Sequence, residues 1–390
     1  MPAVAVAREF SVGPGGPLDR ALARLGLKGA EPPQLVVRAF LPALVFWVPL
    51  AVLAWLRPAA DGHVSVGFFQ DLSTHVRFLV FVPLLILVEA SIGRRSRLVA
   101  VQFSEAKLVA PSGRARFEAQ VRQASRAIDS ALVETIIALL AVSFVWSATQ
   151  SFESDGMIFW SEEAGPSGVR LSAAGWWYAV GSVLPPFLLL RWAWRYLVWC
   201  WLLRSVSRLD LQLAATHPDL AGGLGFVSFG HTAFAGLAFA LSCLVAGAVG
   251  TRVLYEGAAL TAYQWPLAVY VCMAIFVGIA PLAAFWRPMR IAKEAGMLAY
   301  GTFASRYAQD FHGRWIDAGA DKAPLDASGD VQGLADIGGG FERVYAMRPL
   351  PVTLKAVVAF AVAAVAPMLP LLLTVMPLRD LLKLFMQAMI

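Results

Sequence analysis

Five ionisable side chains lie within or at the edges of long apolar stretches of the sequence. They are Glu89, Glu134, Arg191, Arg195 and His231. An ionisable group inside a membrane span is costly, so such a group is a candidate for function. Their similar depth predicts one polar layer, which would serve as a gate, a proton relay or a solute site. The alternative is structural: one ion pair, with the remaining groups reaching water at the span ends.

A second candidate is the loop of sequence HPDLAGGLGF, residues 217–226, just before an apolar stretch. Gly222 and Gly223 would let a helix N-terminus hold an anion there. The structural alternative is that Asp219 caps the helix and the glycines allow close packing. Because loops often carry function, His217 and Asp219 are the loop candidates for a direct role.

A third candidate is a run of tryptophan and arginine around the fourth apolar stretch. Trp192 and Trp199, and likewise Trp194 and Trp201, are seven residues apart and so share a helix face. Together with Arg204 and Arg208, they would bind an anionic lipid headgroup or an anionic solute. An aromatic belt with arginines reaching the interface is the alternative interpretation.

Metal and cofactor chemistry has no visible basis in the sequence. Cys200, Cys243 and Cys272 all lie in apolar runs, and no pair of them has metal-ligand spacing. The HExxH, GxSxG and Walker A patterns are absent. We therefore predict no metal, no cofactor and no catalytic residue, and the sequence favours a protein that is not an enzyme.

The elements that must position these residues are membrane helices. Of the 390 residues, 58% are apolar and only 15% are charged, against about 25% charged in a soluble domain. The mean hydropathy is +0.65. A spanning helix needs about 20 mostly apolar residues. We predict an all-α membrane protein with seven spans, at residues 39–57, 76–93, 131–151, 173–196, 227–250, 263–286 and 354–377.

The distribution of basic residues predicts the orientation. Segments 1–38, 94–130, 191–225 and 287–355 hold 26 of the 32 Lys and Arg residues. Because cytoplasmic loops are enriched in Lys and Arg, these segments and the N-terminus are predicted to be cytoplasmic. The net charge of +6 is explained in this way, so we expect no nucleic acid as a partner.

The predicted organisation has three parts. Residues 1–38 form a cytoplasmic N-terminal segment, and residues 378–390 form an amphipathic tail at the outer interface. Between them, residues 39–377 form the membrane domain, with cytoplasmic segments 94–130, 197–226 and 287–353.

Several cytoplasmic segments are predicted to extend the spans as helices. Residues 114–130 lead into the third span and residues 287–315 continue the sixth, whereas residues 317–340 are predicted to be a loop before a short helix at 341–347. We expect the loop with His217 and Asp219 to meet the 114–130 helix and the 329–348 stretch. Prolines interrupt most of the spans, and such breaks free backbone carbonyls: Pro42, Pro49, Pro83, Pro185, Pro186, Pro281, Pro367 and Pro370. The strongest kinks are predicted at Pro185-Pro186 and at Pro367 with Pro370.

Two loop sequences and the last span suggest a resemblance. HPDLAGGLGF (217–226), GDVQGLADIGGGFERVYAMRPLPV (329–352) and the proline-rich last span resemble a family of bacterial multi-pass membrane proteins with no assigned activity. The resemblance implies a bacterial inner-membrane protein and carries over no catalytic residue. Gly338, Gly339 and Gly340 stand where that pattern leads us to expect more polar residues.

Three functions remain open from the sequence. The first is a channel or carrier for a small ion or solute that uses the polar layer. The second is a non-transporting scaffold or sensor that presents its basic cytoplasmic face to a partner or to anionic lipid. For either function, a homo-oligomer is one predicted partner state. The third is a lipid-modifying membrane enzyme. A wet cavity lined by the ionisable residues would favour transport, whereas paired and sealed residues would favour the scaffold.

Overall fold

Seven stretches of helix are long and apolar enough to cross a membrane, which is the number predicted. The computed structural model describes residues 2–13, 15–24, 32–56, 64–150, 158–165, 168–317 and 329–374. The predicted amphipathic tail, 378–390, therefore lies outside the described residues. The seven stretches are Gln34–Leu56, Leu72–Glu105, Pro111–Thr149, Ala173–Val206, Gly225–Tyr255, Leu260–Asp317 and Leu354–Leu372.

Most of these stretches are built from two consecutive helices. The helices that form them are α3 (Pro32–Leu56), α4 (Leu72–His75) with α5 (Val82–Glu105), α6 (Arg114–Ile128) with α7 (Ala131–Gln150), α8 (Ala173–Gly181) with α9 (Leu184–Val206), α10 (Gly225–His231) with α11 (Ala235–Tyr255), α12 (Gln264–Ile279) with α13 (Trp286–His312), and α15 (Leu354–Val365) with α16 (Leu369–Leu372). Three further helices are α1 (Pro2–Glu9), α2 (Pro17–Arg24) and α14 (Asp330–Ala346).

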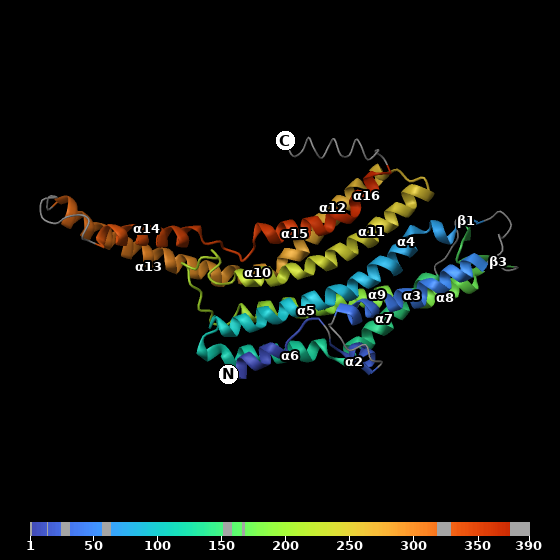
Figure 1. Cartoon of the computed structure of the whole chain (residues 1–390), viewed down its shortest axis with the longest axis horizontal. Helices are drawn as coiled ribbons and strands as arrows, with labels where there is room; N and C mark the ends of the chain where they lie inside the picture. Colours follow the sequence, from blue (N-terminus) through green and yellow to red (C-terminus); the bar gives the residue numbers. More distant parts are fainter. Residues whose placement is uncertain are drawn as a thin grey trace.

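The two ends of the molecule differ. Figure 1 shows α13 and α14 extending as a pair beyond the other helices at one end, which we call the hairpin end. Four short strands lie at the opposite end, the strand end. There β1 (Val64–Val66) pairs in parallel with β2 (Ile158–Phe159), and β3 (Glu162–Gly165) pairs antiparallel with β4 (Gly168–Leu171). The strands add a small β element to a fold predicted to be purely helical.

Helix α5 lies at the centre of the packing. It contacts α1, α3, α9, α10 and α11, which come from distant parts of the sequence. Phe103 on α5 is buried and packs edge-on against Phe226, with ring centroids 5.0 Å apart, and stacks on Phe285 at 6.2 Å. Such aromatic contacts add to the apolar burial. Residues on α5 are therefore well placed to join separate parts of the bundle.

Helix α14 corrects the sequence prediction of a loop over 317–340. Residues 330–346 are helical, and residues 318–328 lie outside the described part. Each glycine in a helix costs about 1 kcal/mol relative to alanine, so the glycine-rich sequence suggested a loop. The structure shows that α14 packs along α13, where Gly333 lies against Tyr307 and Gly296 lies against Val344. This close packing accounts for Gly333 but not for Gly338, Gly339 and Gly340, where nothing lies within 4 Å of the position of a Cβ.

Pro281 breaks the helix between α12 and α13, as the sequence predicts, whereas Pro42 and Pro49 lie inside the continuous helix α3 and do not interrupt it. Without an N–H, Pro281 leaves the carbonyl of Val277, four residues earlier, without its helical donor. The Tyr196 hydroxyl donates to that carbonyl at 2.5 Å. The next carbonyl, that of Gly278, lies 2.5 Å from Nε2 of His231. Side chains from α9 and α10 therefore satisfy the broken turn.

Replacing Tyr196 tests this account. Tyr196→Phe removes the donor and leaves the Val277 carbonyl unpaired at the apolar surface of α12, where no water replaces the donor, so we expect a loss of about 1–3 kcal/mol. The measurement is thermal or denaturant unfolding in detergent.

Tyr270 provides a matched control, because its hydroxyl donates to the Ala238 carbonyl within the continuous helix α11. That carbonyl keeps its helical donor, so Tyr270→Phe should cost clearly less. Equal losses for the two variants would contradict this role for Tyr196.

Candidate functional site

The carboxylate of Glu89 on α5 is the centre of a buried group of charges. Its Oε1 accepts from Arg195 and, at 3.4 Å, from Arg191, both on α9. Its Oε2 accepts from Arg38 on α3 at 3.3 Å. The side chains of Glu89 and Arg195 are only 4% and 2% exposed. One carboxylate therefore joins three arginines from two other helices.

Two further carboxylates complete this group. Asp19 on α2 pairs with Arg38 and Arg191, and lies 3.3 Å from Arg195. Glu134 on α7 lies 3.3 Å from Nε of Arg191. We call these six side chains the charge cluster: Asp19, Arg38, Glu89, Glu134, Arg191 and Arg195. With three acids and three bases it has no formal net charge, which limits the cost of burying it.

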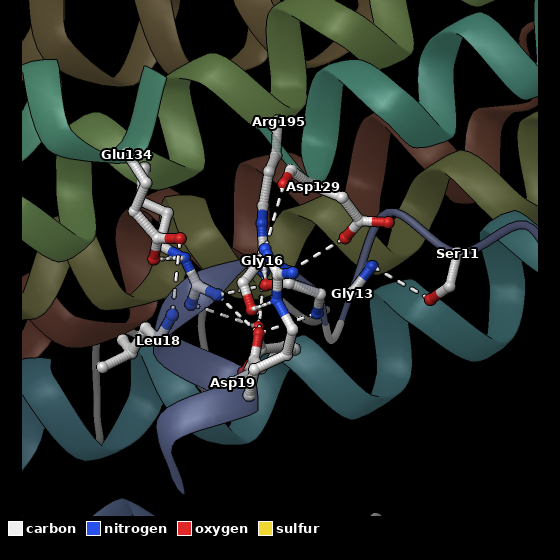
Figure 2. Close-up of polar contacts among 12 residues, drawn as sticks. Ser11, Gly13, Gly16, Leu18, Asp19, Asp129, Glu134 and Arg195 are labelled. Carbon is white, nitrogen blue, oxygen red and sulfur yellow. Dashed lines mark hydrogen bonds and ion pairs between the residues drawn. The ribbon is translucent and has the colours of Figure 1, made fainter. Parts of the chain in front are cut away.

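Part of the N-terminal segment, residues 11–13 and 15–24, closes the cluster with its own backbone. The carbonyl of Gly15 accepts from Arg191 at 2.6 Å and from Arg195 at 2.8 Å. The N–H of Gly16 donates to Asp129 at 2.9 Å, and φ of Gly16 is +91°, which favours glycine. Figure 2 shows Arg195 reaching toward Asp19 and Gly16 on this segment.

Glycine is also required where this segment crosses α5. A Cβ on Gly13 would lie 2.4 Å from the carbonyl oxygen of Glu89 and 2.7 Å from Cα of Gly93. Beside it, the N–H of Val12 donates to the Ser96 hydroxyl at 3.0 Å. The segment is thus held against α5 by direct backbone approach.

The predicted layer of five ionisable residues is therefore brought together in part. Glu89, Glu134, Arg191 and Arg195 meet, whereas His231 lies apart from them. Nδ1 of His231 accepts from the indole N–H of Trp199 at 3.1 Å, so Nε2 carries the proton donated to Gly278. His231 is fully buried, and both of its ring nitrogens are used in structural hydrogen bonds.

Sequence reasoning missed Asp19 and Arg38. Both lie in the polar N-terminal segment, 1–38, which carried no sign of folding back into the bundle. One local signal was present: Pro17 and Asp19 fit the first turn of a helix, where proline and acidic residues are favoured. That signal predicts α2 but does not indicate which arginines it faces.

Two of the four tryptophans predicted to contact lipid, Trp192 and Trp199, are buried inside the protein, and Trp194 is half-buried. The indole N–H groups of Trp192 and Trp194 donate to the carbonyls of Leu85 and Ala127, both at 3.0 Å. Trp192 and Trp199 are buried, because each indole N–H needs an acceptor that the bilayer core does not offer. Three members of the predicted set are exposed, so for them lipid contact stays a prediction: Trp201, Arg204 and Arg208.

The loop before α10 is organised around Asp219. Its Oδ1 accepts from the N–H groups of Ala221 at 2.8 Å and Gly223 at 3.1 Å, and its Oδ2 from Gly225 at 2.8 Å. Nδ1 of His217 lies 2.8 Å from Oδ1. Burial alone would raise the pKa of Asp219, but these backbone donors and His217 hold it below its ordinary value.

The same loop contacts the 329–348 stretch, as predicted. Arg348 donates to the Asp219 carbonyl at 2.8 Å, and its own N–H donates to the carbonyl of Leu220, also at 2.8 Å. Leu220, Gly222 and Gly223 have positive φ. The two glycines therefore serve the turn, and the loop anchors the chain that leaves α14.

Among the described residues, no three His, Cys, Asp or Glu side chains are grouped so as to hold a metal ion. The chemistry available in the charge cluster is ion pairing and hydrogen bonding.

The class of protein that the fold defines is a multi-pass membrane protein. Beyond that class, no protein family, no curated protein and no solved structure matches the chain. This outcome is consistent with the resemblance to a family that has no assigned activity, and it carries over no functional residue.

Breaking the charge cluster should destabilise the fold strongly. Glu89→Gln leaves three buried arginines with two carboxylates, and removing one partner of a buried pair costs about 3–5 kcal/mol. Unfolding in detergent, followed by tryptophan fluorescence, measures the loss. Adding Arg195→Gln should recover part of it, since the excess positive charge is then removed.

Glu118→Gln is the matched control, because Glu118 forms an i,i+4 pair with the exposed Arg122. Such surface pairs contribute about 0.3–0.5 kcal/mol. Similar losses for Glu89→Gln and Glu118→Gln would show that the cluster is not a buried charge network.

Asp219 gives a prediction with a pH dependence. Because its pKa is lower in the folded protein, its stabilising contribution is fully present above the ordinary value of 3.8 and is lost as the pH falls through the native value. The difference in Tm between the protein and Asp219→Asn should be constant from about pH 7 to pH 5 and shrink below 3.8.

The comparison is made in a His217→Asn background, so that the neighbouring imidazole does not titrate. A difference that already disappears above pH 5 would mean that the pKa of Asp219 is raised, contrary to the geometry.

Proposed function

We propose that the protein is a non-transporting membrane scaffold that presents the α13–α14 hairpin to a partner protein on the cytoplasmic side. The observation that carries the proposal is the state of the charge cluster. Its six members are paired with one another and covered by the N-terminal segment. Glu89, Arg191 and Arg195 line none of the three main cavities among the described residues, whereas Asp19 lines the third, of about 410 Å³, together with Gly15, Gly16 and Asp129.

A route for ions or solutes needs polar groups that exchange partners with water or cargo. In the charge cluster each arginine already pairs with carboxylates, and Arg191 and Arg195 also bind the Gly15 carbonyl. Moving a charge through this site would require breaking several buried pairs at once, at a cost of several kcal/mol. The mutual pairing of Glu89, Arg191 and Arg195, which line no main cavity among the described residues, thus supports the scaffold over the channel or carrier.

The hairpin supplies the presenting surface. Leu298 and Phe303 on α13 are 75% and 56% exposed, and Tyr345 on α14 is 67% exposed. Trp286 at the start of α13 is also exposed, and Arg290 lies over its ring at 5.4 Å, an arrangement typical of a membrane interface. From the helical rise, Leu298 lies about 18 Å beyond Trp286. Exposed apolar side chains at such a distance favour a protein partner over lipid.

The cytoplasmic assignment rests on the predicted orientation. Figure 1 shows that α1 and the connection between α5 and α6 lie nearer the hairpin end than the strand end. The segments that contain them, 1–38 and 94–130, are among those rich in Lys and Arg. The excess of basic residues on this side supports a cytoplasmic hairpin end.

Cross-linking and flux measurements test the proposal together. With a photo-crosslinking side chain in place of Leu298, we expect one discrete adduct in cells, and with the same group in place of the exposed Gln309 we expect at least fivefold less. The substitution Phe303→Glu should weaken the adduct at position 298. Reconstituted vesicles should show no flux of protons, potassium or chloride above empty liposomes.

Two outcomes would overturn the proposal. One is flux that Glu89→Gln abolishes, which would make the charge cluster part of a transport route. The other is a failure to cross-link a partner protein at position 298. An adduct with twice the mass of 42.0 kDa would mean that the hairpin contacts a second copy of the chain. No adduct would mean that the hairpin contacts no protein.

A further inference from the structure

Two cavities lie one after the other along α9. The strand-end cavity has a volume of about 400 Å³, and the central cavity has a volume of about 310 Å³. Leu189 on α9 lines both, and Leu244 and Leu241, neighbours on one face of α11, line the first and the second respectively. The two cavities therefore form successive parts of one path along α9 and α11.

The central cavity offers only apolar surface. Its two tyrosines have already used their hydroxyls: Tyr196 donates to the Val277 carbonyl and Tyr270 to the Ala238 carbonyl. Met273 and Val277 on its wall are exposed on the surface of α12, so the cavity borders the region that faces lipid. An alkyl chain is the occupant that such a site suits.

The strand-end cavity differs because it contains a cation. Arg77 lines it, and no carboxylate lies within ion-pair distance of this guanidinium among the described residues. Its contacts are a hydrogen bond to the Tyr178 hydroxyl and a position over the same ring, 5.7 Å from the centroid. Arg77 is half-buried within a span, where a cation normally pairs with a carboxylate. Among the described residues, the guanidinium of Arg77 lacks this counter-charge.

A second polar group in the same cavity also lacks a partner. The hydroxyl of Ser182 is buried and forms no hydrogen bond. Buried polar atoms are nearly always paired, so an unpaired hydroxyl beside an unpaired cation indicates a missing acceptor. Arg77 lies five residues from the start of the second span, about 8 Å along the helix, which is close to headgroup depth.

We propose that these cavities bind one membrane phospholipid. Its phosphate accepts hydrogen bonds from Arg77 and Ser182, and one acyl chain runs past Leu189 into the central cavity. The distance along α9 from Pro185 to Tyr196 is about 17 Å, which matches the roughly 15 Å depth of one leaflet of the hydrocarbon core. The positive charge of Arg77 and the length of the path along α9 therefore both favour a phospholipid.

The test uses the full-length protein in phosphatidylcholine vesicles that contain a small fraction of phosphatidylglycerol with a diazirine in one acyl chain. We expect light-induced labelling of peptides that contain Met273 or Tyr196. Arg77→Gln should reduce this labelling at least tenfold, and Arg77→Lys should restore part of it. Excess inorganic phosphate should have no effect, because the chain supplies much of the affinity.

Arg95→Gln is the matched control, since Arg95 also lies over an aromatic ring, that of Phe229 at 4.8 Å, and donates to a hydroxyl, that of Thr232. It lines neither cavity, so its labelling should equal that of the unchanged protein. Leu189→Trp, which fills the path, should reduce labelling of Met273 even if Arg77→Gln does not fold.

Equal labelling in Arg77→Gln and Arg95→Gln would overturn the proposal. Competition by inorganic phosphate would also overturn it, because a free anion rather than a phospholipid would then occupy the site. Unchanged labelling of Met273 in Leu189→Trp would show that the chain does not follow the path along α9.

Discussion

The packing of the helix bundle depends on one constraint. Charged side chains that are buried away from water must pair with side chains of opposite charge. Glu89 lies on the central helix α5, and its carboxylate is matched by arginines on α3 and α9. Three acids and three bases meet, so each helix that contributes one depends on the others for its partner. An ion pair of this kind adds little net stability over an apolar contact, but a missing partner is severely penalised. The cluster therefore fixes which helices meet.

The same constraint acts on the backbone at the helix breaks. Within a bilayer an unpaired carbonyl has no water to bind, so a proline break needs a side-chain donor from a neighbouring helix. Tyr196 and His231 fill this need near Pro281. Ser242 does the same for the Ala364 carbonyl, beside the break at Pro367. Tyr196, His231 and Ser242 thus bind carbonyls at breaks in other helices.

The sequence predicts much of this architecture and only part of the candidate site. Apolar length is a local property, so the seven spans follow from it directly. That Glu89, Glu134, Arg191 and Arg195 meet also follows from their common depth, since intramembrane charges need partners. His231 does not belong to the group, because its partner is the Gly278 carbonyl, beside the helix break at the distant Pro281. The role of Asp19 and the helix α14 could not be predicted from the sequence. Both depend on contacts with distant parts of the chain, which the helix preference of the residues does not reveal.

The fold-back of the N-terminal segment has a consequence for how the protein is made. The Gly15 carbonyl and the Arg191 side chain that binds it are 176 residues apart in the sequence. At typical rates of synthesis, Arg191 leaves the ribosome roughly 10 to 35 s after Gly15. During that interval Asp19 has none of its α9 partners. The residues around Gly15 therefore reach their final place only after α9 has been made, and closure of the bundle is coupled to insertion of its fourth span.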